Sequence, residues 1–99
     1  LFIERLDHFA PVLGVQWRKL SLSNASTRWG SAASDGSIRL NWRLVHFKME
    51  TIDYVVVHEL SHLRVMDHSP MFWETVRNVV PDYAHRRAEL KDEAIPKWV

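Results

Sequence analysis

Ninety-nine residues, of which 46% are hydrophobic and 25% charged, suffice for one small hydrophobic core and are too few for two. Thirteen Lys and Arg against twelve Asp and Glu give a formal net charge of +1, which lacks the basic excess of a phosphate-binding surface, so we do not expect nucleic acid as a partner. The chain has no cysteine, which excludes disulfides and thiolate metal sites.

No uninterrupted apolar run approaches the ~20 residues that cross a bilayer, and the chain does not open with a secretory signal sequence. We therefore expect a cytoplasmic protein without a membrane partner. Residues 1–99 are expected to form a single domain. Because the sequence begins at Leu1 and helical spacing is already present there, we expect this domain to be a fragment of a longer chain.

The beginning of the chain predicts a helix followed by a strand. Large apolar side chains recur at helical spacing between Phe2 and Phe9, and Pro11 and Gly14 are expected to end this segment. Residues 15–23 alternate between apolar and polar side chains with one change of phase, which predicts a strand.

A turn signal separates two further predicted strands. Residues 27–32 and 37–43 flank the tripeptide Ser-Asp-Gly at 34–36, a sequence that favours a tight turn. The second strand alternates strictly, and its apolar positions are Ile38, Leu40 and Trp42. The strands are therefore expected to form a hairpin within a small antiparallel sheet.

From residue 49 the apolar spacing changes to that of helices. Residues 49–66 predict one helix, whose core-facing side chains are Ile52, Val56, Leu60 and Leu63. Ser69 and Pro70 form a helix-start signal, and the helix that follows is expected to end at Pro81. A last helix is expected over residues 82–94. This order of elements predicts an α+β fold, with a small antiparallel sheet packed against the helices.

The helix predicted over residues 49–66 carries a metal-binding motif. His58 and His62 are four positions apart, so their side chains lie one turn apart on the same face and can reach one ion. With Glu59 they form H-E-x-x-H, in which two histidines bind zinc and the glutamate is the general base of a metallopeptidase. We therefore predict Zn²⁺ as the cofactor and Glu59 as the catalytic residue.

A catalytic zinc usually takes a third protein ligand, and His68 is the first choice for it. If the helix continued, position 68 would lie about 120° away from His62 around the helix axis, so the helix must end between them. We expect Asp67 to end it, because Asp tolerates the left-handed conformation that closes many helices. Glu74 and Asp82 are alternative third ligands.

Several separate motifs stand in the order expected of one protein family: residues 27–31 (TRWGS), 41–45 (NWRLV), 53–63 (DYVVVHELSHL), 68–70 (HSP) with Phe72 and Trp73, and 81–83 (PDY). Through them nearly the whole chain resembles the YgjP-like metallopeptidases, relatives of the SprT-like proteases. The resemblance implies a zincin-like minimal metallopeptidase domain, with His58, His62 and His68 as the metal ligands and Glu59 as the catalytic residue. The family commonly has Cys where this chain has Ala32, so a role of that thiol does not carry over.

Other residues near these motifs have two interpretations each. Tyr54, one turn before His58, either polarises the scissile carbonyl or packs beside the site. Trp29 either contacts substrate or, as is more common for a large aromatic residue, belongs to the core. Arg28 and Arg43 either bind a carboxylate or, by default, pair with local acids.

Together these features predict a zinc-dependent metallopeptidase that hydrolyses peptide bonds of a peptide or protein substrate with metal-activated water. An extended substrate could add to the sheet edge formed by residues 29–32. Two other functions stay open. One is a non-catalytic, zinc-stabilised interaction module, and the other is a nucleic-acid-associated protease, which the near-neutral charge disfavours.

Overall fold

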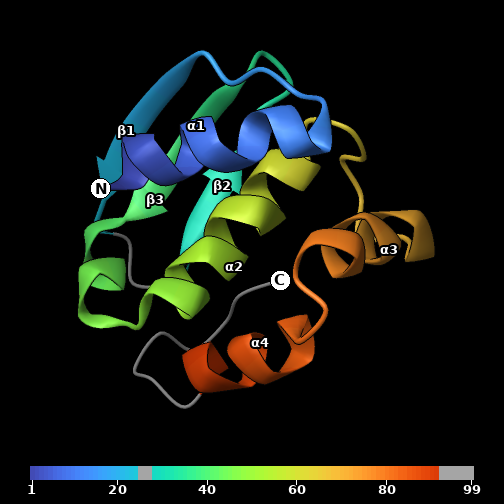
Figure 1. The fold of residues 1–99 in the computed structure, drawn as a ribbon. Coiled ribbons are helices and arrows are strands. Elements are labelled where there is room, and N and C mark those ends of the chain that lie inside the picture. The colour runs from blue at the N-terminus through green and yellow to red at the C-terminus, as the bar shows by residue number, and fades with distance from the viewer. Residues whose placement is uncertain (25–27, 92–99) are drawn as a thin grey trace.

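The computed structural model describes residues 1–24 and 28–91, which form a three-stranded sheet, one short 3₁₀ helix and four α-helices. α1 and α2 lie together on one side of the sheet, and α3 and α4 pack on α2 further from it (Figure 1). Within the described residues, every helix is too short or too polar to cross a bilayer. The elements are α1 (Phe2–Leu13), β1 (Lys19–Ser23), β2 (Gly30–Ala32), β3 (Ser37–Asn41), η1 (Trp42–His46), α2 (Met49–Ser61), α3 (Pro70–Val79) and α4 (Tyr83–Lys91).

The predicted hairpin is confirmed, but the sheet is mixed and not purely antiparallel. β2 and β3 pair antiparallel around a turn in which Gly36 has a φ of 94°, a conformation that suits glycine. The strand order is β1-β3-β2, so β1 lies beside β3 and runs parallel to it. The predicted antiparallel sheet is thus correct for β2 and β3, and the parallel pair arises because β1 joins the sheet on the side of β3 that β2 leaves free. Thr27, the first residue of the second predicted strand, lies outside the described residues.

α1 ends where predicted, at Gly14, and packs along α2. It includes Pro11, and Gly14 has the left-handed φ of 69° typical of a helix C-terminus. A bidentate pair joins the two helices, because the guanidinium of Arg5 donates to both carboxylate oxygens of Asp53 at 2.7 and 2.8 Å. The side chains of α1 that face the interior are Phe2, Leu6, Ala10 and Leu13.

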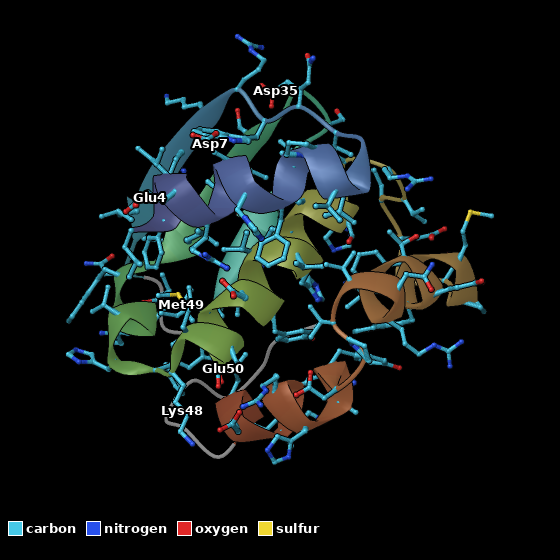
Figure 2. All side chains as sticks on the ribbon, in the orientation of Figure 1. Glu4, Asp7, Asp35, Lys48, Met49 and Glu50 are labelled. Carbon is cyan, nitrogen blue, oxygen red and sulfur yellow. The ribbon has the colours of Figure 1, made fainter. Side chains whose placement is uncertain are left out.

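α2 is the central helix of the domain. Ten of its residues are buried, because α1, β2, β3, α3 and α4 all contact it. Charged side chains lie on the outside of the molecule, where Figure 2 shows Glu4 and Asp7 on α1 and Lys48 and Glu50 around the start of α2. Because other elements enclose α2 on most sides, polar residues near its end, such as His58 and Glu59, are shielded from water.

α3 and α4 complete the core on the far side of α2. Pro70 begins α3 as predicted, and Phe72 and Val76 turn inward from it. α4 is tied to α2 by the hydroxyl of Thr51, which donates to Glu89 at 2.9 Å. The predicted extension of the last helix over residues 92–94 lies outside the described residues.

Candidate metal and catalytic site

Three imidazoles converge at the end of α2. His58 comes from its last turn, His62 is the C-cap residue that follows it, and His68 comes from the loop that leads to α3. The Nε2 atom of His68 lies 3.1 Å from that of His62 and 3.4 Å from that of His58. His58 and His62 are buried, whereas His68 is exposed. The cluster therefore has a buried floor and one side that solvent can reach.

These separations fit a tetrahedral metal ion. With Zn–N bonds of about 2.0–2.1 Å, two ligand nitrogens of a tetrahedron lie roughly 3.3–3.4 Å apart. The observed distances of 3.1 and 3.4 Å bracket that value. Burial lowers the pKa of His62, which favours the neutral imidazole that a cation requires.

Hydrogen bonds on the opposite ring nitrogens orient two of the three imidazoles. Nδ1 of His62 lies 3.2 Å from the carbonyl oxygen of Val65, which can only accept, so Nδ1 carries the hydrogen and the lone pair of Nε2 is free. Nδ1 of His58 lies 3.3 Å from the hydroxyl of Tyr54. Burial raises the pKa of Tyr54, so this hydroxyl stays protonated. Such partners hold ligand rings in place before a metal arrives.

The chain bends after α2 so that His68 reaches His58 and His62. The bend is made by tighter helical turns and not by a residue in the left-handed conformation. α2 ends at Ser61, earlier than predicted, and the amides of His62 and Arg64 donate to carbonyls three residues back at 3.2 and 3.0 Å. No non-glycine residue in the described part of the chain has a positive φ, so the proposed conformation of Asp67 was wrong. Its carboxylate instead accepts from the amide of Ser69 at 3.2 Å, where α3 begins.

The first turn of α3 forms an aromatic wall behind the three imidazoles. Phe72 stacks on His62 with ring centroids 4.4 Å apart and meets His58 and His68 edge-on at 4.9 and 5.0 Å. Trp73 lies 5.6 Å from His58 and 5.9 Å from His68. Phe72 belongs to the buried core and Trp73 packs against it, and both side chains also pack against the imidazole rings.

The carboxylate of Glu59 lies against β2 and is only 2% exposed. A Cβ on Gly30 would be 3.0 Å from both Cγ and Oε2 of Glu59, so a glycine is required where the strand passes the carboxylate. Burial raises the pKa of Glu59 to about 8, and the positive charge of Arg28 opposes this effect. Gly30 was not predicted as a site residue. Its one signal was its place in the motif at 27–31.

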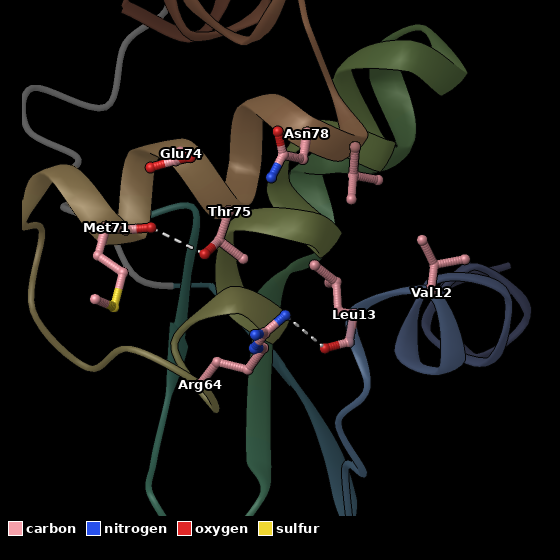
Figure 3. A pocket seen from close by; sticks show the side chains of 8 residues that line it. Val12, Leu13, Arg64, Met71, Glu74, Thr75 and Asn78 are labelled. Carbon is pink, nitrogen blue, oxygen red and sulfur yellow. Dashed lines mark hydrogen bonds between the residues drawn. The ribbon is translucent and has the colours of Figure 1, made fainter.

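The two alternative third ligands lie elsewhere. Glu74 lines a different pocket of about 370 Å³ between the end of α1 and α3, together with Arg64 and Asn78 (Figure 3). Asp82 accepts from Arg86 at 3.0 Å on the surface of α4. Within the described residues, His68 is thus the candidate that joins the histidines of α2.

The structure places both predicted substrate contacts away from open solvent. The hydroxyl of Tyr54 lies behind His58, on the nitrogen that faces away from the other two imidazoles. Trp29 is 2% exposed and meets Phe47 edge-on with centroids 5.2 Å apart. These positions suit an orienting role for Tyr54 and a packing role for Trp29.

Comparisons with known proteins agree with this geometry. Abylysin from Pyrococcus abyssi, described as a metallopeptidase zymogen, superimposes with a TM-score of 0.88 at 22% identity over 100% of both chains. Jannalysin from Methanocaldococcus jannaschii, also described as a metallopeptidase zymogen, gives a TM-score of 0.79 at 17% identity over 93% of this chain and 95% of its own. Their likeness shows that this chain shares their fold, which confirms the predicted α+β class. No curated protein sequence matches the chain.

The family resemblance seen in the sequence motifs is confirmed independently of these structures. The sequence model described as "YgjP-like, metallopeptidase domain" matches residues 1–93, which is nearly the whole chain. The chain therefore belongs to the YgjP-like metallopeptidase family.

Proposed function

We propose that this domain is a zinc-dependent peptidase in which His58, His62 and His68 hold the metal and Glu59 is the general base. The observation that carries the proposal is that Nε2 of His68 lies 3.1 and 3.4 Å from those of His62 and His58, close to the ligand spacing of a tetrahedral metal. The buried carboxylate of Glu59 belongs to the residue next to His58. Membership of a metallopeptidase family supports peptide hydrolysis as the reaction.

Zinc is the metal that best suits this set of ligands. The chain has no thiolate to offer, and three imidazoles with a further position for water are a common arrangement of catalytic zinc. A bound zinc ion would polarise the scissile carbonyl and make the attacking water more acidic.

Glu59 supplies the proton transfers. Its carboxylate takes a proton from the attacking water and later delivers it to the leaving amine. Burial supports this role, because it raises the pKa of Glu59 and so makes the carboxylate a stronger base toward the proton of the water. Gly30 leaves the space in which the carboxylate lies, so the backbone of β2 helps to position it.

An edge strand beside the carboxylate offers a place for the substrate. β2 is an edge of the sheet, and Gly30 at its start contacts Glu59. An extended peptide that hydrogen-bonds to β2 would pass close to the carboxylate, in the way that peptides add to exposed sheet edges.

The substitution Glu59→Gln tests the proposal. Because the amide keeps the shape of the side chain but cannot take a proton, the variant should bind one zinc ion per chain and lose peptide hydrolysis by about 10²-fold or more. Metal content and cleavage of a peptide library are measured on both proteins. A variant that cleaves peptides as fast as the parent would refute the role of Glu59. A parent that binds zinc without any turnover would instead support a zinc-stabilised interaction module.

A further inference from the structure

A small basic pocket shares a wall with Glu59. It has a volume of about 110 Å³ and is lined by Ser23, Arg28, Gly30, Ser31 and Arg39. Gly30 lines the pocket, and a Cβ on this residue would lie 3.0 Å from Oε2 of Glu59, so the pocket and the carboxylate share Gly30 as a neighbour. Any group held in this pocket is therefore within a few residues of a peptide bond at the metal site.

The pocket opens on the face of the sheet that is turned away from α2. Ile38 and Leu40 of β3 are buried, whereas Arg39 between them is exposed and so lies on the opposite face. Ser31 of β2 is the cross-strand partner of Arg39, which places its side chain on that same face. Ser31 and Arg39 therefore present a hydroxyl and a guanidinium group on this face, and Ser23 and Arg28 also line the space.

This part of the chain carries far more positive charge than the whole. Residues 15–48 contain six basic side chains against the single acid Asp35, although the complete sequence has a net charge of only +1. In the described part of the chain, Arg5 and Arg86 have carboxylate partners, and no ion pair involves Arg28 or Arg39. The expected ion pair of Arg28 with a local acid is thus not seen there, although its charge acts to lower the pKa of the buried Glu59.

We propose that this pocket binds an acidic side chain of the substrate, so that the enzyme prefers extended peptides with Asp or Glu near the scissile bond. This inference rests on the proposed peptidase function. A peptide added to the edge at β2 directs alternate side chains to the two faces of the sheet. A side chain on the outer face beside Ser31 reaches the guanidinium groups, which bind carboxylates with directed, charge-assisted hydrogen bonds.

The test is a set of peptides in which one Glu is moved along an otherwise neutral sequence, each paired with a Gln version. An exposed charge pair changes an equilibrium constant by up to about fivefold, so two guanidinium groups should favour Glu by about five- to twentyfold in kcat/KM. The preference should occur at one position or at positions two apart. Arg39→Gln should reduce this preference for Glu over Gln about three- to fivefold. Arg77→Gln removes the same charge from the surface of α3 and should have no effect.

Three outcomes would refute the proposal that the pocket binds an acidic side chain. These are equal cleavage of Glu and Gln peptides, a gain at every position alike, or an equal response to the two arginine substitutions. Binding of the same peptides to zinc-loaded Glu59→Gln protein, followed by fluorescence anisotropy, separates this proposal from the catalytic one. If the parent binds Glu peptides preferentially at one position but cleaves none of them, the proposed acidic side-chain site is supported and the proposed peptidase activity is refuted. An uncharged peptide and a short oligonucleotide are tested in the same way. If Arg39→Gln weakens oligonucleotide binding and no preference for Glu peptides is found, the surface binds nucleic acid and the proposal is refuted.

Discussion

Gly30→Ala is expected to impair catalysis without removing the metal ligands. The added methyl group would lie 3.0 Å from Cγ and Oε2 of Glu59 and 3.1 Å from the carbonyl oxygen of Arg39. The carbonyl belongs to the paired strand β3 and cannot move away without disturbing the sheet, so the carboxylate of Glu59 must shift. Overpacking of this kind costs about 1–3 kcal/mol of stability, and a displacement of about 1 Å in a catalytic group can cost 10²-fold in rate.

The assay compares kcat/KM, bound zinc and melting temperature. We expect kcat/KM to fall by about 10- to 100-fold, with one zinc ion still bound. Gly14→Ala is the matched control, because it also destabilises the protein, through a φ of 69°, but its methyl group has no atom within 4 Å. If Gly30→Ala kept the kcat/KM of the parent, or if Gly14→Ala lowered kcat/KM by the same factor, the close approach of β2 would not position Glu59.

Three further predictions concern the ligands and their environment. His68→Ala should lower zinc affinity at least about 10²-fold while Glu74→Gln leaves it unchanged, as measured by competition with a chromogenic chelator, and equal effects would contradict the ligand assignment. Tyr54→Phe removes the partner of Nδ1 of His58 and should weaken zinc binding about tenfold; unchanged binding would mean that the ring is held by packing alone. In the metal-free protein, burial raises the pKa of Glu59 from 4.5 to about 8, so the folded state retains a proton that the unfolded state loses above pH 4.5. The parent should therefore lose stability relative to Glu59→Gln, by up to roughly 4 kcal/mol, as pH rises from about 4.5 to about 8, and a difference in melting temperature that does not depend on pH would contradict this.

Much of the site could be predicted from the sequence because its parts are local. Helical spacing alone places His58 and His62 on one face of α2, and the need for a third ligand pointed to His68. The turn at 34–36 likewise predicted the hairpin of β2 and β3. In each case, neighbours within a few residues determine the geometry.

Other features depend on contacts between distant segments, which spacing along the chain does not encode. The position of β1 beside β3, and hence its parallel direction, follows from how the strands assemble in the sheet. The close approach of Gly30 to Glu59 requires that sheet to be packed on α2. The sequence by itself determined the candidate metal ligands and the candidate general base. Only the tertiary structure decided how the carboxylate is buried and which strand lies next to it, because burial is a property of the packed layers and not of any one segment.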